Sequence, residues 1–479
     1  MAMLRNAAWV MLGSGFPMLV GVGAFPLLIN ELGTERFGLL SIVWAIAGYF
    51  SLFDLGLGRT LTQMVSDHLG QEKGGVPVRL IWTALCLMLG LGVLGGLILL
   101  AVVPFVVPML HLMPNLDAEA RHAFCFLALS IPVVVVSSGL VGVLEAHLRF
   151  RDVARVRMFV GSLNFLLPVL LTQIWPSLPV LTAGIIGLRV LSLFFFWRLA
   201  RKVEAALSSP CLPDSVWLRP LLSFAGWLSV SNVVSPLMMY FDRFAIGAVA
   251  GASAVAYYVP PFEVMSRLQI LPQSLMTAVF PILTSSHQRK GEHGVHLLVF
   301  AGQMGFLLLL PPLAVIFLFP HELLSLWLGS EFAENSADMV RWMVVGWLVN
   351  VLARPSFNWM QSLGRADLPA KLHCVELPVF GLLLYFGIML FGIEGAAAAW
   401  SCRCVIDSLL LNGLARRCSP QLGKAITRVH LTIFLILLGS LAFSQLTNFV
   451  GRLVLLSSLW LLAGFAGFFA IRYWRTQPQ

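Results

Sequence analysis

The chain has 479 residues, of which 59% are hydrophobic and 11% are charged, and its formal net charge is +9 at pH 7. Soluble globular domains are about 25% charged. So few charges cannot cover a water-facing surface of a protein this long, and a soluble fold is excluded. The basic residues lie in short segments between apolar runs, which is typical of membrane proteins, so no nucleic-acid partner is expected.

The alternation of apolar runs and polar breaks predicts an all-α polytopic membrane protein with about fourteen transmembrane helices. One such helix needs about 20 mostly apolar residues to cross the hydrocarbon core. The first run is too long for the apolar region of a signal peptide and is expected to remain as a span. In chain order the predicted spans are residues 7–29, 38–58, 80–103, 121–145, 156–175, 178–198, 220–246, 254–281, 296–319, 339–360, 372–393, 395–414, 430–450 and 452–471.

The two faces of this predicted bundle differ in basic charge. Loops on the side of the N-terminus contain 22 of the 31 lysines and arginines, whereas the opposite loops contain four. Lysine and arginine concentrate in short cytoplasmic loops, so both termini are expected in the cytoplasm. One missed span would scramble this alternation, and the charge pattern therefore also supports the number of spans.

A charged, proline-containing segment divides the first twelve spans into two groups of six. Residues 1–198 form the predicted N-terminal lobe, residues 199–219 a cytoplasmic linker and residues 220–415 the C-terminal lobe. Because six is even, both lobes enter the membrane from the cytoplasm and are expected to be parallel repeats facing a central cavity. A basic loop at residues 416–429 and a final helix pair with the tail at residues 430–479 complete the chain.

A short internal similarity accompanies the two lobes. The segment LGTERFG at residues 32–38 precedes the second span, and the segment AGASAVA at residues 250–256 precedes the eighth. Both have a glycine at the second position, and both are followed about thirty-five residues later by a basic loop. The similarity supports the interpretation as a repeat.

Ionisable residues inside spans are costly in lipid, so each is a candidate for a cavity or an ion pair. Glu263 and Arg267 are four residues apart in the eighth span, and Arg403 and Asp407 are four apart in the twelfth, so each pair shares a helix face. Each pair is either a structural ion pair or lines the cavity, with its arginine shared with an anionic substrate.

Arg189 is the leading candidate for substrate contact. It lies about eleven residues into the sixth span, roughly 16 Å deep, and no acid stands at helical spacing from it. It needs water, an acid from another helix or an anionic ligand. Arg354, before Pro355 in the tenth span, either faces the cavity or extends its side chain to the interface.

Other charged residues are better explained by local roles. Asp242 and Arg243 are adjacent near the outer end of the seventh span and are expected to be gate or packing residues. Asp54 and Arg59 lie near the inner end of the second span, where a structural role is expected. Prolines are expected to break helices one, seven and eight, because freed backbone groups are tolerated where protein or water surrounds them. These prolines are Pro17, Pro26, Pro236, Pro260, Pro261 and Pro272.

The sequence contains no P-loop, G-x-S-x-G or HExxH motif, and no loop DxD motif. The seven cysteines are interpreted as free thiols. We therefore expect no catalytic residues, no metal site and no cofactor.

Two segments resemble a known family. Residues 31–70, ELGTERFGLLSIVWAIAGYFSLFDLGLGRTLTQMVSDHLG, and residues 240–283, YFDRFAIGAVAGASAVAYYVPPFEVMSRLQILPQSLMTAVFPIL, are similar to bacterial Wzx-like oligosaccharide flippases. These belong to the superfamily that also holds the MATE exporters and the lipid II flippase MurJ. The resemblance implies alternating access in the bacterial inner membrane by a protein that works among membrane lipids, with a polymerase and a chain-length regulator as further partners.

The cargo that the resemblance implies is an undecaprenyl-pyrophosphate-linked oligosaccharide, moved from the cytoplasmic to the periplasmic face. Midspan arginines suit its pyrophosphate, which makes Arg189, Arg267, Arg354 and Arg403 the binding candidates. Coupling to H+ or Na+ is expected, with Glu263, Glu376 and Asp407 as candidate sites.

Three alternatives stay open at the level of the sequence. Fourteen spans in place of the twelve often assigned to Wzx proteins bring a MurJ-like lipid II flippase into consideration, where the last helix pair forms a groove for the lipid tail. A MATE-type exporter of organic cations would want unpaired acids in its cavity, whereas the unpaired midspan charge here is Arg189. A polysaccharide polymerase or ligase needs a substantial outer loop with catalytic residues, and the outer loops here are short.

Overall fold

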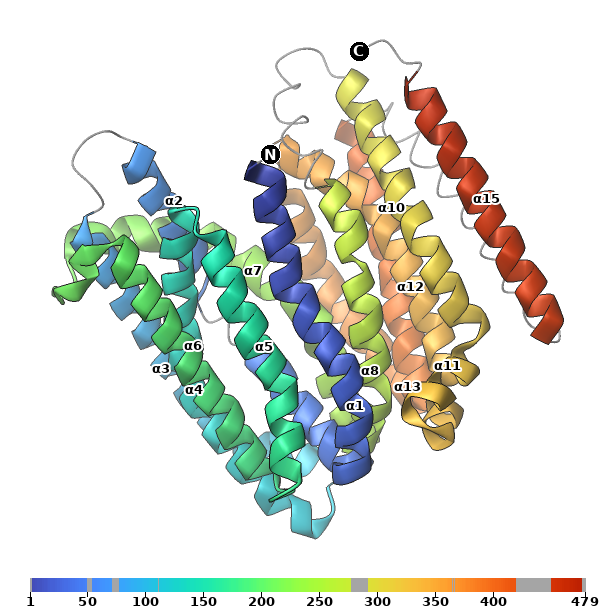
Figure 1. The fold of residues 1–479 in the computed structure, drawn as a ribbon, viewed down its shortest axis with the longest axis horizontal. Coiled ribbons are helices and arrows are strands. Elements are labelled where there is room, and N and C mark those ends of the chain that lie inside the picture. The colour runs from blue at the N-terminus through green and yellow to red at the C-terminus, as the bar shows by residue number, and fades with distance from the viewer. Residues whose placement is uncertain are drawn as a thin grey trace. The chain divides into compact units, whose positions relative to one another are not determined.

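The computed structural model describes residues 2–49, 54–70, 77–110, 112–276, 292–363, 365, 367–418 and 449–475, and these residues contain helices and connecting turns without a strand (Figure 1). The helices are α1 (Ala2–Tyr49), α2 (Leu57–Gly70), α3 (Val78–Met109), α4 (Pro114–Ala146), α5 (Phe150–Thr172), α6 (Leu178–Val203), the 3₁₀ helix η2 (Ala205–Ser208), α7 (Ser215–Ala250), α8 (Ala252–Leu268), α10 (Glu292–Leu318), α11 (Pro320–Leu328), α12 (Ser330–Ser362), α13 (Asp367–Cys418) and α15 (Phe449–Arg475).

Within these described ranges, seven helices are long and apolar enough to cross a membrane, judged by length and composition. They are α1, α3, α4, α5, α6, α10 and α13. The first and the last of them each hold two predicted spans. The predicted spans 220–246, 254–281, 339–360 and 452–471 correspond to α7, α8, α12 and α15, while most of the span predicted at 430–450 lies outside the described residues.

Glycines make the connections inside α1 and α13. Gly33 has φ 74° and ψ 168°, and Gly392 has φ 58° and ψ −137°. A positive φ is readily adopted only without a Cβ atom. Two predicted spans therefore join through a single non-helical residue, with no loop between them.

One predicted boundary is wrong, and one predicted span contains a turn. The second span was expected to run to residue 58, but α1 ends at Tyr49, and a turn at Asp54–Gly56 leads into α2. Leu55 and Gly56 have φ 49° and 79°, left-handed values that no helix continues through. In the eighth predicted span, expected to reach residue 281, a turn at Gln269 follows α8 and the helix resumes over residues 270–276, while residues 277–281 lie outside the described residues.

Contacts divide the chain into two compact units, Met1–Pro260 and Pro261–Gln479. In the first unit α1 packs on α5, and α4 packs on both α3 and α6. In the second unit α12 packs along α13 and also contacts α10 and α11, while α15 contacts α10. The two lobes and the linker at residues 199–219 were inferred from the number of predicted spans, and they stay predictions.

The two segments of the internal similarity adopt matching turns in the first unit. Gly251 follows α7 with φ 87° and ψ 171°, close to the values at Gly33. The turns also approach one another: a Cβ atom added to Gly38 would lie 1.8 Å from the carbonyl oxygen of Ala252. The glycine at position 38 therefore lets the backbones of α1 and α8 meet directly.

Candidate functional site

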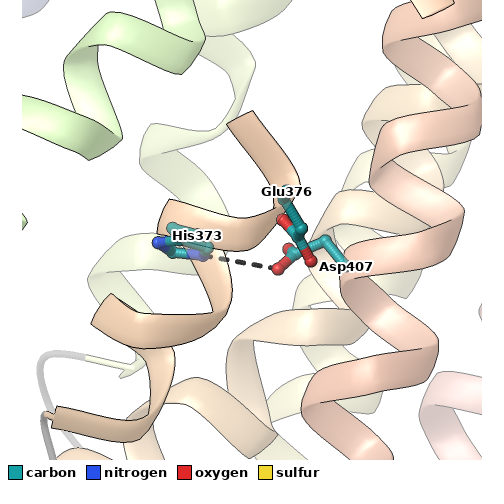
Figure 2. A group of neighbouring side chains, drawn as sticks. All are labelled: His373, Glu376 and Asp407. Carbon is teal, nitrogen blue, oxygen red and sulfur yellow. Dashed lines mark ion pairs between the residues drawn. The ribbon is translucent and has the colours of Figure 1, made fainter. Parts of the chain in front are cut away.

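Three ionisable side chains gather between the two halves of α13 in the second unit. His373 and Glu376 precede the kink at Gly392, and Asp407 follows it. One donor atom of each residue lies within 4.8 Å of the others, and His373 Nε2 is 3.3 Å from Asp407 Oδ1 (Figure 2). The arrangement offers one imidazole nitrogen and two carboxylates to a cation.

These groups are largely withdrawn from solvent. Glu376 is 4% exposed and Asp407 is 5% exposed. Neither carboxylate oxygen of Glu376 has a hydrogen-bond partner among the described residues, and Asp407 Oδ1 has none either. Buried polar atoms are almost always hydrogen-bonded, so unsatisfied oxygens on neighbouring carboxylates indicate a site that takes up a further positive charge.

Packing explains how these side chains come together. Gly387 and Gly395 flank the kink of α13, and a Cβ atom on Gly395 would lie 1.9 Å from the carbonyl oxygen of Gly387. The two halves of the helix can therefore approach closely. Phe357 of α12 stacks on His373 with ring centroids 6.3 Å apart and fixes the imidazole in place.

Glu376 and Asp407 were predicted from the sequence as candidate coupling sites, whereas His373 was not. His373 and Glu376 are three residues apart, a spacing that puts both on one face of a helix. The position of His373 beside Glu376 could therefore have been predicted from the sequence. The contact with Asp407 across the kink could not, because it depends on packing between the two halves of the helix.

The partner of the Arg403 side chain differs from the one predicted from the sequence. Arg403 was expected to pair with Asp407, but the structure places His373 Nε2 3.3 Å from Asp407 Oδ1, a contact that is an ion pair only when the imidazole is protonated. Arg403 is 8% exposed, its guanidinium lies 5.3 Å from the centroid of the Phe380 ring, and its Nη2 is 3.6 Å from Cys404 Sγ. Helical spacing allowed the expected pair, but burial of the arginine stem against Phe380 turns the guanidinium to the aromatic face.

The predicted pair of Glu263 and Arg267 is present. Arg267 Nη2 lies 3.5 Å from Glu263 Oε2, and the arginine side chain is 50% exposed. An exposed pair of this kind contributes about 0.5 kcal/mol to helix stability. Contact with a substrate stays a prediction for Arg267.

Arg354 has a partner that the sequence did not predict. Its Nη2 donates a hydrogen bond of 3.0 Å to Oε1 of Gln269, and Gln269 Nε2 donates one of 3.3 Å to the carbonyl oxygen of Trp347. Gln269 forms the turn after α8. Arg354 therefore holds the end of α8 to α12, and a further contact with substrate stays a prediction.

Arg189 lies on α6 in the first unit, partly buried. Its Nε is buried without a hydrogen-bond partner, and no described residue forms an ion pair with its guanidinium. An arginine cannot lose its charge as readily as a lysine, so this group requires water or an anion. It remains the leading candidate for substrate contact.

Asp242 and Arg243 take part in a buried network, being 0% and 2% exposed. Tyr258 Oη donates a 2.7 Å hydrogen bond to Asp242 Oδ2, and the Arg243 guanidinium lies 4.8 Å from the centroid of the Tyr240 ring. The Asp242 carboxylate thus ties α7 to α8.

Asp54 closes the turn between α1 and α2. Its Oδ1 accepts a 2.8 Å hydrogen bond from the Gly56 N–H, and its Oδ2 accepts one of 2.8 Å from the Ser138 hydroxyl of α4. Arg59, in the first turn of α2, is exposed.

Most of the prolines named do not end a helix, and the bending expected at them stays a prediction. α1 continues through Pro17 and Pro26, α7 through Pro236, and α8 through Pro260 and Pro261. Neighbouring groups in membrane helices re-satisfy the backbone atoms that a proline frees, so a proline need not end the helix. The last of the set, Pro272, lies beyond the turn at Gln269, so the break comes before it.

Comparison with solved structures defines the class of protein. A structure of the lipid II flippase MurJ in an inward closed conformation matches with a TM-score of 0.72 at 12% identity, covering 94% of this chain and 97% of that chain. A multidrug resistance MATE family transporter of the MOP superfamily in its inward-facing conformation matches with a TM-score of 0.69 at 14% identity, covering 86% and 98%. The fold is that of polytopic membrane transporters, and the predicted all-α multi-pass fold is confirmed.

Sequence comparison then gives the family. The model described as "Polysaccharide biosynthesis protein" matches residues 3–287, and the MatE model matches residues 228–386. The chain is 30% identical over 421 residues to the "Putative O-antigen transporter" of Shigella flexneri, covering 88% of this chain and 99% of that protein. It is 22% identical over 364 residues to the "Uncharacterized membrane protein EpsK" of Bacillus subtilis (strain 168), covering 74% and 70%.

The chain belongs to the polysaccharide biosynthesis protein family. The resemblance to Wzx-like flippases within the MOP superfamily is confirmed. The protein is a membrane transporter and not an enzyme, as the names of its relatives and structural neighbours indicate.

Proposed function

We propose that the protein is an alternating-access flippase that moves an undecaprenyl-pyrophosphate-linked oligosaccharide repeat unit from the cytoplasmic to the periplasmic face of the bacterial inner membrane. The observation that carries the proposal is the 30% identity to a protein named as an O-antigen transporter, which extends over 99% of that protein. The basic loops on the side of the N-terminus support cytoplasmic termini.

The unpaired guanidinium of Arg189 supports an anionic cargo. Arginine binds phosphate through two parallel N–H donors, and such charge-assisted bonds are about twice as strong as neutral ones. A lipid-linked pyrophosphate would satisfy the charge that no described residue satisfies. On this proposal the protein works beside a polymerase and a chain-length regulator, and its cycle is coupled to H+ or Na+.

A lipid II flippase is the second candidate. The fold match to MurJ, with a TM-score of 0.72, favours it. At 12% identity that match supports the fold alone, whereas the match to the polysaccharide biosynthesis family extends through the sequence of residues 3–287. A cation-coupled drug exporter, suggested by the MatE match over residues 228–386, is the third.

The test is deletion of the chromosomal gene, followed by complementation. Loss of a surface polysaccharide with accumulation of its lipid-linked repeat unit, reversed by the wild-type protein, is the expected result. Lethality with accumulated lipid II would indicate the MurJ-like function instead. An intact glycan with raised sensitivity to cationic dyes would indicate a drug exporter.

Complementation with Arg189→Ala tests the binding residue separately. Arg198→Ala is the matched control, because Arg198 is an exposed arginine near the cytoplasmic end of the same helix α6. Expression and membrane insertion of both variants are measured by quantitative blotting. Failure of Arg189→Ala beside full rescue by Arg198→Ala would support the anion contact, and equal rescue by both would remove Arg189 from the site.

A further inference from the structure

The charges around Glu376 and Asp407 do not balance. With both carboxylates ionised, Arg403 is the one permanent cation among the described groups that act electrostatically on Glu376, and His373 adds a positive charge only when its imidazole binds a further proton. Without that proton, one negative charge is left over. An uncompensated charge at a buried position is strongly destabilising, whereas a neutral arrangement is tolerated. The site therefore calls for one additional positive charge.

The unsatisfied hydrogen bonds favour a proton as this additional positive charge. An ionised carboxylate can only accept hydrogen bonds, and both oxygens of Glu376 and Oδ1 of Asp407 have no donor among the described residues. One proton on either carboxyl group creates an O–H donor on that residue, and a carboxylate oxygen of the other residue lies within 4.8 Å. A single proton held between the two groups would thus supply a donor and remove the surplus negative charge at the same time.

A sodium ion fits this donor set less well. Hard cations are held by several oxygen ligands, but one of the three donors here is the His373 imidazole, a ligand suited to softer metals and to protons. Phe357 stacks on this imidazole. A sodium ion would therefore find too few oxygens among the described side chains.

The surroundings contain few other groups that could titrate. On α13 these are Arg403 and the buried thiol of Cys404. On α12, Arg354 lies three residues before Phe357, and its guanidinium is bonded to Gln269. In the part of the chain that the structure describes, Arg403 is therefore the charged group outside the cluster that acts on Glu376.

We propose that Glu376 and Asp407 share one proton in the membrane, and that His373 accepts this proton when it leaves toward the cytoplasm. In that step the O–H bond of the carboxyl group breaks and an N–H bond forms at Nε2 of His373, which lies 3.3 Å from Asp407 Oδ1. His373 is the most exposed of the three, at 14%, and stands nearest to the start of α13. This inference deepens the proposed function, on which it rests, by naming the coupling ion and its site.

Loss of the proton would change the angle between the two halves of α13. His373 and Glu376 belong to the first half of the helix, Asp407 belongs to the second, and the halves meet at Gly392. Two ionised carboxylates repel one another across these halves, whereas a shared proton holds them together. Proton binding is thereby linked to the angle between two transmembrane segments, which is what a transport cycle requires.

The test is an infrared pH titration of the purified full-length protein in lipid nanodiscs, without substrate. A protonated carboxyl group gives a carbonyl stretching band that is lost on ionisation. We expect a band that titrates in the wild type, is absent in Glu376→Gln and persists in Glu394→Gln, since Glu394 is an exposed carboxylate of the same helix. Thermal unfolding of each variant shows whether it is folded, and Asp407→Asn provides a second variant if Glu376→Gln is not.

Two results would overturn the proposal. One is a titrating band unchanged in both folded variants, which would assign the proton elsewhere. The other is loss of the band on adding NaCl at constant pH, with KCl as the ionic-strength control, which would make the site a sodium site. Because the titration uses no lipid-linked sugar, it can succeed even where the deletion strain shows no glycan defect, so the two proposals fail separately.

Discussion

Substitution of Gly38 by alanine tests the close contact between α1 and α8. The added Cβ atom would lie 1.8 Å from the Ala252 carbonyl oxygen and 2.6 Å from its carbonyl carbon. Non-bonded carbon contacts are optimal at about 3.5–4.0 Å, so the two backbones would have to separate by roughly 1.5 Å. Neither atom belongs to a side chain that could rotate away.

The expected cost is large for a single methyl group. Overpacking typically destabilises by about 1–3 kcal/mol, and contact between two backbones places this case at the upper end. For domains of up to about 250 residues, 1 kcal/mol lowers Tm by about 2–4 °C. We therefore expect Gly38→Ala to unfold on the order of 5–10 °C below the wild type, measured by intrinsic fluorescence of the detergent-purified protein.

Gly23→Ala is the matched control, because Gly23 lies in the same helix and a Cβ atom there meets nothing within 4 Å. Alanine in a helix interior is more favourable than glycine by about 0.5–1 kcal/mol, so Tm of this variant should be unchanged or higher. Equal Tm values for Gly38→Ala and Gly23→Ala would refute the reasoning, since they would mean that the backbones do not meet at Gly38.

Three further substitutions test the second unit, each by thermal unfolding of the purified protein. Gln269→Ala should destabilise the protein by about 1.5–3 kcal/mol, because it removes the hydrogen-bond acceptor of the Arg354 guanidinium. If the losses of stability from Gln269→Ala and Arg354→Ala simply add in the double variant, the hydrogen bond between them contributes nothing. Gly392→Ala should cost about 1–2 kcal/mol, since φ is 58° there, and an unchanged Tm would contradict this backbone conformation. Arg452→Met should cost less than about 1 kcal/mol through its half-exposed pair with Glu322. A larger loss would show that its contacts with the Phe319 and Phe449 rings, or its hydrogen bond to the Leu318 carbonyl oxygen, contribute more than the pair.

The membrane fold could be predicted from the sequence because its signal is local. About 20 apolar residues must follow one another to cross the bilayer, and such runs can be read directly. The turns were harder to predict. Prolines are visible in the sequence but did not end the helices, whereas Gly33 and Gly392 look like any other glycine until their positive φ values are known.

The candidate site could be predicted in part for the same reason. A charge inside a span is costly wherever it lies, so Glu376 and Asp407 stand out without any structure. Which charges meet depends on packing. Asp407 pairs with His373, 34 residues away along the chain, and the helical spacing that suggested Arg403 as its partner carries no information on that contact.

The single-residue turns at Gly33, Gly251 and Gly392 have a consequence for access from the periplasm. On the predicted topology all three face the periplasm, and none of them leaves a loop that a periplasmic protease could cut. An epitope tag inserted at any of these positions would split two packed helices. Tags for topology mapping belong instead near α11 (Pro320–Leu328), where the outward chain is long enough to carry one.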